Sequence, residues 1–189
     1  MDSRDYEGLM NSSVSHRIIS WIQEIIRITR PGETQMITAT NLLYSKSAIA
    51  RMECVNAEDV LRLEVWRSVV FVIIRGRRPK FYSKKAFKVH FVELRQARAK
   101  ALTATQNIFN PNIYYVRNET KSTAYTVNFF TGGAVCECED WQNQSKFFGL
   151  AACKHIYAAL NQMNISSLRT YIEERRAIAR AIVNSPPAA

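Results

Sequence analysis

The chain has few of the features that mark membrane, secreted or disordered proteins. Its most apolar run, "VVFVII" at 69–74, has six residues, far short of the roughly 20 needed to cross a bilayer. The opening "MDSRDYEGLM" lacks the charged and then apolar design of a signal peptide. Glycine occurs only six times and 47% of the residues are apolar, which favours a globular chain over a disordered one. We therefore expect a soluble, intracellular protein of the cytoplasm, nucleoid or nucleus, with no membrane partner.

Acidic residues are scarce relative to basic ones. The 189 residues include 16 Asp and Glu against 26 Lys and Arg, which gives a formal net charge of +10. Most of the imbalance falls in residues 75–100, where ten basic residues face a single acidic one, Glu93. Such a block favours a polyanionic partner such as nucleic acid, and a solvated face without a specific partner is the alternative interpretation.

Cysteine and histidine are also rare, but they are not scattered. Three of the four cysteines and one of the three histidines lie in "VCECEDWQNQSKFFGLAACKHI" at 135–156. Clustered thiols in a chain without an export signal favour a metal site or catalysis over disulfides. Cys54 stands alone and is expected in or near the core. We expect His16 and His90 to be ordinary surface or core-edge residues rather than ligands.

Hydrophobic periodicity predicts the elements of the N-terminal half. A helix is expected at 14–28, where large apolar residues recur at three-and-four spacing before "RPG" stops it. Residues 33–54 are ambiguous and are left unassigned. Residues 56–66 are expected to be helical, with Asn56 as the N-cap. The β-branched residues at 69–74 indicate a buried strand.

The basic segment is expected to continue as a helix over 80–105. A strand is the alternative at 86–94, but the length and the alanines favour a helix. One face of this helix would be apolar, with Phe87, His90, Phe91, Leu94, Ala97 and Ala101. The opposite face would carry Lys84, Lys85, Lys88 and Arg95. Phe81 and Tyr82 are candidates for stacking on nucleic-acid bases.

The C-terminal half is predicted to place a β-hairpin before a helix. After a break at 110–112, strands are expected at 113–118 and 124–130, the second with alternating apolar residues. A glycine turn at 131–133 would then lead into a paired strand, "AVCEC" at 134–138.

The clustered cysteines and histidine can meet on this framework. Alternation along a strand points Cys136 and Cys138 to one face. Cys153 and His155 converge on them only if Cys153 lies at or before the start of the next helix, with His155 in its first turn. The helix dipole and free backbone amides there favour a thiolate. Three thiolates and one imidazole suit Zn²⁺, whereas an iron–sulfur cluster with this ligand set is less usual.

The same residues carry a family resemblance. One residue separates Cys136 from Cys138, fourteen residues follow Cys138, and one residue again separates Cys153 from His155. This resembles the SWIM zinc finger, whose pattern is C-x-C, a variable gap and C-x-H on a β-hairpin and helix. "CECEDW" and "CKHI" extend the resemblance, which covers about 113–163, although alanine precedes the third cysteine where many members have proline. It implies DNA-associated biology, through nucleic-acid binding or protein interaction.

The sequence therefore predicts an α+β protein in three parts. These are a mixed N-terminal region at 1–106 that holds the basic segment, a zinc unit of two strands and a helix at 107–164, and a closing helix with its tail at 165–189. The closing helix carries an apolar stripe that would pack on its own domain or face a partner. The stripe consists of Leu168, Ile172, Ala179 and Ile182.

Two functions fit these features. Four protein ligands leave no position for water, and the chain has no Walker A pattern and no further metal-ligand motif, so we expect no enzyme and no small-molecule substrate. The first hypothesis is a nucleic-acid-binding zinc protein, with DNA favoured over RNA, acting in recombination, transposition or regulation. The second is an adaptor whose zinc unit docks a larger DNA-processing protein. The residues predicted to contact nucleic acid are Arg75, Arg77, Arg78, Lys84, Lys85, Lys88 and Arg95.

Overall fold

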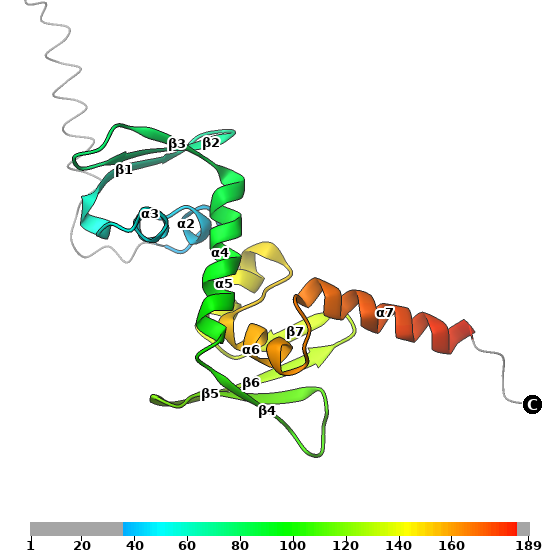
Figure 1. The fold of residues 1–189 in the computed structure, drawn as a ribbon. Helices are drawn as coiled ribbons and strands as arrows, with labels where there is room; N and C mark the ends of the chain where they lie inside the picture. The colour runs from blue at the N-terminus through cyan, green and yellow to red at the C-terminus, as the bar shows by residue number, and fades with distance from the viewer. Residues whose placement is uncertain (1–35, 185–189) are drawn as a thin grey trace, which may run out of the picture. The chain divides into compact units, whose positions relative to one another are not determined.

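The structure, a computed structural model, describes residues 36–184, so the helix expected at 14–28 lies outside the described residues. Two antiparallel sheets, one of three strands and one of four, are combined with helices along the chain (Figure 1). This is the mixed α+β class that the sequence predicts. Within residues 36–184, no helix has both the length and the apolar content needed to cross a membrane.

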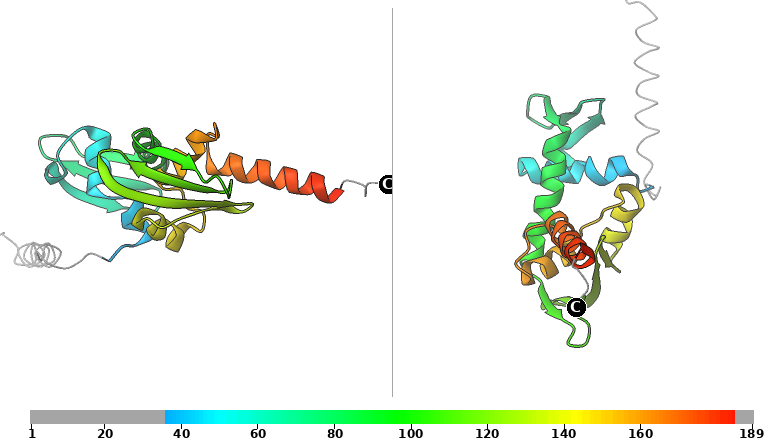
Figure 2. Two further views of the ribbon diagram at one scale, coloured as in Figure 1. Left: turned by 90° about the horizontal axis from the view of Figure 1, so that it is seen from below. Right: turned by 90° about the vertical axis from the view of Figure 1, so that its right-hand side faces the viewer.

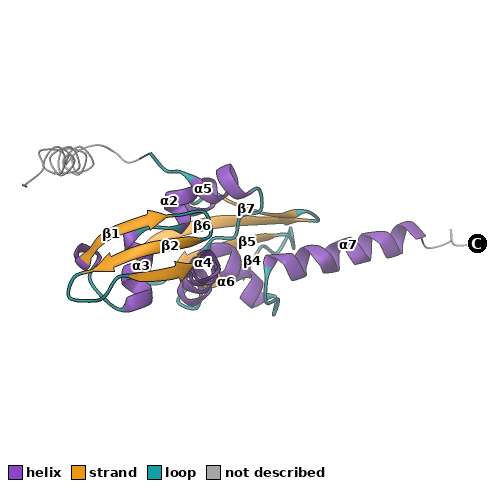
Figure 3. Ribbon diagram, turned by 90° about the horizontal axis from the view of Figure 1, so that it is seen from above, coloured by secondary structure: helices purple, strands orange, loops and turns teal. Residues whose placement is uncertain are grey.

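The three-stranded sheet lies in the N-terminal half and has the order β1–β2–β3 (Figure 3). Its strands are β1 at Val60–Val65, β2 at Val69–Ile74 and β3 at Lys80–Ser83. Along β2 the side chains alternate, so Val70, Val72 and Ile74 are buried while the residues between them are half-buried. The buried strand predicted at 69–74 is thereby confirmed.

The prediction of a helix at 56–66 is wrong. Only Ala57–Asp59 form a helical turn, of the 3-10 type, and β1 follows it directly. The acidic residues that suggested a helix start lie in this short turn. Pairing with β2, which sets Val65 opposite Val70, outweighs the local signal because it buries one face of β1 in the core.

The segment left unassigned at 33–54 contains two short helices, α2 at Ala39–Leu43 and α3 at Lys46–Glu53. Each begins at a side-chain cap. The hydroxyl of Thr38 accepts the Asn41 amide at 3.2 Å, and the hydroxyl of Ser45 accepts the Ala48 amide at 3.2 Å. The second helix buries Ile49 completely in the core beneath the three-stranded sheet.

The basic helix is shorter than predicted at both ends. Helix α4 spans Lys84–Ala99, because residues 80–83 form β3 and the next strand begins at Thr103. The Ser83 hydroxyl fixes the start of the helix by accepting the Ala86 amide at 3.1 Å. The helix interpretation of 86–94 is confirmed.

The two faces predicted for α4 hold only in its first half. Phe87 is buried as expected, but Ala97 and Ala101 are exposed, and the Arg95 side chain is only 12% exposed. The buried side of the helix shifts because its second half packs against elements of the C-terminal region, through Ala99 among others. The two faces predicted from the sequence assumed a single packing partner along the whole helix.

The four-stranded sheet has the order β4–β5–β6–β7. Its strands are β4 at Thr103–Gln106, β5 at Ile113–Asn118, β6 at Lys121–Phe130 and β7 at Gly133–Cys136. The turn that joins β6 and β7 places Phe130 opposite Gly133, and Val127 and Phe129 are buried. The strands predicted at 113–118 and 124–130 and the glycine turn are confirmed. Because β4 pairs with β5, residues on both sides of the predicted boundary at 106/107 share one sheet.

Three helices complete the C-terminal half, α5 at Glu139–Phe148, α6 at Lys154–Gln162 and α7 at Leu168–Asn184. Helix α6 packs on the four-stranded sheet and on α4 (Figure 2). Its residues Ile156, Ala159 and Leu160 are fully buried. The first turns of α7 bury Tyr171 against Phe129, with ring centroids 4.9 Å apart. The helices expected at the end of the chain are confirmed.

The apolar stripe predicted on α7 divides between two environments. Leu168 and Ile172 are buried in the core, whereas Ala179 and Ile182 are exposed on the later turns of the helix. Ile178 lies beside them and is 51% exposed. Only the first part of the stripe packs on its own domain among the described residues.

We expect Phe87→Ala to destabilise the protein by about 3–5 kcal/mol, because it empties a fully buried ring site in α4. The ring is 1% exposed and makes edge contacts with Tyr44 and Tyr82, with centroids 5.3 and 6.3 Å away. Denaturant unfolding measures the difference. The matched control is Val89→Ala on the same helix, which is 44% exposed and should change the free energy of unfolding by less than about 1 kcal/mol. Equal effects of the two changes would contradict the assigned core.

Candidate metal centre

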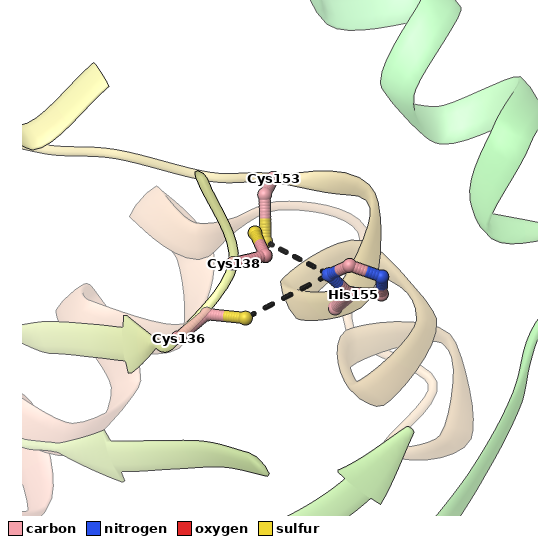
Figure 4. A group of neighbouring side chains, drawn as sticks. All are labelled: Cys136, Cys138, Cys153 and His155. Atoms are coloured by element: carbon pink, nitrogen blue, oxygen red, sulfur yellow. Dashed lines mark hydrogen bonds between the residues drawn. The ribbon is translucent and has the colours of Figure 1, made fainter. Parts of the chain in front are cut away.

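Four side chains from three elements converge on one buried point. Cys136 is the last residue of β7, Cys138 and Cys153 are the N-caps of α5 and α6, and His155 lies in the first turn of α6 (Figure 4). Their ligand atoms all lie within 4.8 Å of one another, and all four residues are buried. This Cys3His group is able to hold a metal ion. The sequence predicted all four members.

The β6–β7 hairpin fixes the first cysteine. Cys136 pairs with Val127 across the hairpin, so its thiol projects from the buried face of the sheet. The expectation that Cys138 continues this strand is wrong, because β7 ends at Cys136. Cys138 nevertheless keeps an extended backbone, with φ −73° and ψ 149°, so the side-chain alternation persists and both thiols face the same point.

Helix α5 begins on the second cysteine. The Cys138 sulfur accepts the Trp141 amide at 3.4 Å, which makes the cysteine an N-cap in place of the usual hydroxyl or carboxylate. The Trp141 indole donates in turn to the Ala134 carbonyl at 3.1 Å, which ties the first turn of the helix back to β7. The cap and the indole together hold the Cys138 thiol in place.

The second pair of ligands has the arrangement expected from the sequence. Cys153 lies just before α6 in an extended conformation, with φ −81° and ψ 172°, and His155 follows in the first turn. The His155 Nδ1 atom is 3.7 Å from the Cys136 sulfur and 3.8 Å from the Cys153 sulfur. The imidazole ring stacks on Tyr125 of β6, with centroids 4.2 Å apart and planes 25° apart. This stacking orients Nδ1 toward the three thiols.

The fourteen residues between the two ligand pairs are mostly helical, and the sequence analysis did not predict this helix. Helix α5 occupies ten of them and ends at Gly149, which has a positive φ of 70° that glycine adopts without steric cost. Gln144, only 3% exposed, accepts the Ala152 amide at 3.2 Å and so holds the chain that returns toward Cys153. Acidic residues at 139–140 and the glycine ten positions later were the available signals for this helix.

An ion pair joins this unit to α4. The Arg95 guanidinium donates to both carboxylate oxygens of Asp140, at 2.6 and 3.0 Å, and Asp140 lies in the first turn of α5. The same guanidinium lies 3.4 Å from the centroid of the Phe91 ring. Arg95 was predicted on the solvent side of α4, and that prediction is wrong because its charge is engaged here. A bidentate, half-buried pair of this kind fixes orientation as well as adding energy.

The thiols perturb one another strongly. Hydrogen bonds from Cys136 and then Cys153, with the Trp141 amide also contributing, lower the pKa of Cys138. The same interactions with Cys136 and Cys138, together with burial, raise the pKa of Cys153. One thiolate therefore forms readily, and further ionisation would bury like charges without compensation. A bound cation supplies that compensation, so the chemistry of the cluster favours metal binding.

The predicted nucleic-acid residues separate into those that contact another side chain and those that form no ion pair within the described range. Arg75 lies 3.8 Å from an Asp59 carboxylate oxygen, and Arg77 lies 2.7 Å from a Glu53 carboxylate oxygen. The Lys84 ammonium lies 5.6 Å from the centroid of the Tyr44 ring. The remaining members are exposed and form no ion pair with any residue of the described range. They are Arg78, Lys85 and Lys88.

Comparison with protein-family models, with curated proteins and with solved structures found no match to this chain.

The cysteine and the histidine that lie outside the cluster, among the described residues, are in different environments from its members. Cys54 is exposed at the C-terminal end of α3, against the expectation of a core position. His90 is half-buried on α4, and burial followed by the Arg51 charge lowers its pKa. The functional interpretation therefore depends on the four clustered residues and on the surfaces around them.

Replacing one ligand should affect the protein far more than replacing the isolated cysteine. We expect Cys138→Ser to cost more than about 4 kcal/mol of stability in metal-loaded protein, because it removes a metal ligand as well as a sulfur cap. Cys54→Ser is the matched control and should change stability by less than about 0.5 kcal/mol, since Cys54 is exposed. Thermal unfolding with and without a chelator measures both. The metal assignment fails if the chelator shifts neither the wild type nor the Cys54→Ser control.

Proposed function

We propose that the Cys3His group binds one Zn²⁺ and that the protein is a non-enzymatic, nucleic-acid-binding zinc protein of the SWIM type. The observation that carries the metal assignment is the spacing of the donor atoms. A tetrahedral zinc with Zn–S near 2.3 Å and Zn–N near 2.0–2.1 Å requires sulfur and nitrogen ligands about 3.6 Å apart. The His155 nitrogen lies 3.7 and 3.8 Å from the sulfurs of Cys136 and Cys153. The donor set of three sulfurs and one imidazole also suits zinc.

The zinc is proposed to be structural. Four protein ligands fill a tetrahedral shell and leave no position for a water molecule or a substrate. The burial of all four residues supports this, because a catalytic metal needs access from solvent. In this role the ion joins the end of β7 to the starts of α5 and α6.

The arrangement around the ligands supports the SWIM-type assignment. The first two cysteines follow the β6–β7 hairpin and the last two ligands open α6, as the C-x-C and C-x-H halves of that pattern require. The additional helix α5 lies in the gap whose length varies in that family. The proposed unit is thus a hairpin and a helix with one helix inserted.

Nucleic-acid binding is proposed to occur through the exposed basic side chains of the N-terminal half. Arg78 precedes β3, and Lys85 and Lys88 lie in the first turns of α4, so the three follow one another along the chain and point into solvent. Lys and Arg that neutralise phosphates bind by releasing counterions, without sequence preference. We favour DNA over RNA from the SWIM resemblance, in a process such as recombination, transposition or regulation.

An adaptor role is the second candidate, and a specific surface favours it. An apolar groove of about 470 Å³ lies between α4, the end of α5 and the start of α7, with Phe91, Phe148 and Leu150 among its walls. Beyond it, α7 exposes Ile178, Ile182 and Val183. Such apolar surface suits a protein partner. Under this reading the zinc unit and α7 would dock a larger DNA-processing protein.

Freshly purified protein should contain one zinc per chain. Elemental analysis and native mass spectrometry measure the stoichiometry, and substitution with Co²⁺ reports the ligand field. A tetrahedral site with three sulfurs should give visible Co²⁺ absorption together with sulfur-to-metal charge transfer, and Cys138→Ser should weaken both. Less than about half an equivalent of zinc, or an octahedral Co²⁺ spectrum, would overturn the structural-zinc proposal.

Reversing the three exposed charges should reduce nucleic-acid binding without unfolding the protein. In the triple variant Arg78→Glu, Lys85→Glu and Lys88→Glu, we expect weaker binding to all sequences alike. The slope of log affinity against log salt should flatten by about 2.7 for duplex DNA, because each lost phosphate contact removes about 0.9. Mobility shifts over a salt series measure the slope.

The control for this variant carries the same change in net charge elsewhere. It reverses three exposed arginines of α7, which are Arg169, Arg176 and Arg180. If the control flattens the slope as much as the test variant does, overall charge alone drives binding and the basic block has no special role. If the wild-type protein does not bind nucleic acid, the adaptor function replaces the first proposal.

A further inference from the structure

Three aromatic rings gather on the outward face of the three-stranded sheet. Trp66 follows β1, Phe71 lies in the middle of β2, and Phe81 lies on β3. The centroid of Trp66 is 5.5 Å from that of Phe71 and 5.3 Å from that of Phe81, and Phe71 and Phe81 are 5.2 Å apart. The three rings, which we name the aromatic trio, therefore touch one another as a single patch.

The register of the strands explains why the trio faces outward. Phe71 pairs with Phe81 across β2 and β3, so the two side chains lie on the same face. Phe71 lies between Val70 and Val72, which point into the core, so alternation turns it the other way. Tyr82, the other aromatic on β3, points inward and donates to a Glu53 carboxylate oxygen at 2.5 Å. Of Phe81 and Tyr82, the two rings predicted to stack on bases, only Phe81 lies on the outward face of the sheet.

The trio is exposed to an extent that core packing does not explain. Trp66 is 47% exposed and Phe81 is 59% exposed. Single exposed apolar residues are common, but contiguous aromatic surface on a folded domain marks an interaction site. The patch therefore suits a binding partner that presents a flat, apolar surface.

Neighbouring side chains hold the Trp66 ring in place. Its indole donates to one carboxylate oxygen of Glu64 at 3.0 Å, and the Arg62 guanidinium donates to the other at 2.6 Å. The negative charge of Glu64 is therefore already compensated by Arg62. A ring that is fixed before binding loses little conformational freedom when a partner stacks on it.

The charge around the trio selects the kind of partner. Residues 60–83 contain six basic side chains and one acidic side chain. Four of the six form ion pairs with Glu53, Asp59 or Glu64, so the positive charge offered to a partner depends on Arg67 and Arg78. Arg67 is exposed directly after Trp66, and Arg78 is exposed in the connection that leads to Phe81. Positive side chains beside stacked rings complement a partner that carries both phosphates and flat bases.

We propose that the aromatic trio binds single-stranded nucleic acid, with bases stacked on the rings and phosphates near Arg67 and Arg78. This inference rests on the proposed nucleic-acid function and names the form that is bound. In a duplex the faces of the bases are hidden by stacking, so rings on a sheet surface cannot reach them. In a single strand the bases splay out and stack on aromatic side chains.

The test uses zinc-loaded full-length protein, a short oligothymidine strand and a duplex of the same length. Phe81→Ala should weaken binding of the single strand by at least about fivefold, since one stacked base contributes a factor of this order or more. Duplex affinity should change by less than about twofold. Trp66→Phe keeps a ring, so it should retain affinity and lose the fluorescence quenching that the strand produces in the wild type.

The matched control is Phe130→Ala, which removes a ring that is 50% exposed on the four-stranded sheet and should leave both affinities unchanged. Melting temperatures establish that each variant is folded. If Phe81→Ala binds the single strand like wild type while charge reversal of the basic block still weakens binding, the stacking site is wrong and the nucleic-acid function stands. If the wild type binds neither form, both proposals fail. A dimer in light scattering that Phe81→Ala dissociates, without any effect on the strand, would assign the patch to a second copy of the chain.

Discussion

The convergence of three sulfurs and one imidazole nitrogen is the constraint on which the C-terminal half depends. The donor atoms lie within 4.8 Å of one another although they come from β7, α5 and α6. Each ligand lies at or next to the end of an element, so the cluster specifies where the strand ends and where both helices begin. Tyr125 and Trp141 then fix the imidazole and one thiol from the sides. Secondary structure and metal chemistry are here specified by the same residues.

Helix α4 links this cluster to the rest of the described chain. Its N-terminal half packs Phe87 into the core of the three-stranded sheet, and its C-terminal half packs against α6 and pairs Arg95 with Asp140. Asp140 follows Cys138 by only two residues, so the ion pair lies next to the Cys3His cluster. Helix α4 therefore connects the three-stranded sheet, with its basic and aromatic surfaces, to the buried Cys3His cluster beside the four-stranded sheet. The Cys3His cluster, which is proposed to stabilise the fold, is thus separate from the surfaces that are proposed to bind nucleic acid.

The sequence predicted the cluster well because its signals are local and chemically specific. The condition that all four ligands converge put Cys153 at or before a helix start, and side-chain alternation with the glycine turn predicted the hairpin pairing. It did not predict β1, where long-range pairing with β2 outweighed an apparent helix start, nor the role of Arg95, whose partner lies 45 residues away. Helix α5 was missed because its cap is a cysteine, which a search for hydroxyl and carboxylate caps overlooks. The aromatic trio depends on strand register, which short apolar runs do not reveal.

The position of the ligands along the chain also bears on the order in which the protein folds. Cys136 and His155 are only 19 residues apart, so a metal ion that joins them closes a short loop at a small entropic cost. The contact between Arg95 and Asp140 must close a loop more than twice as long. Contacts between distant parts of a chain are generally the slower ones to form. With an ion bound, the Cys3His unit would be suited to act as a folding nucleus, and we would expect α4 and the sheet that precedes it to assemble on it afterwards.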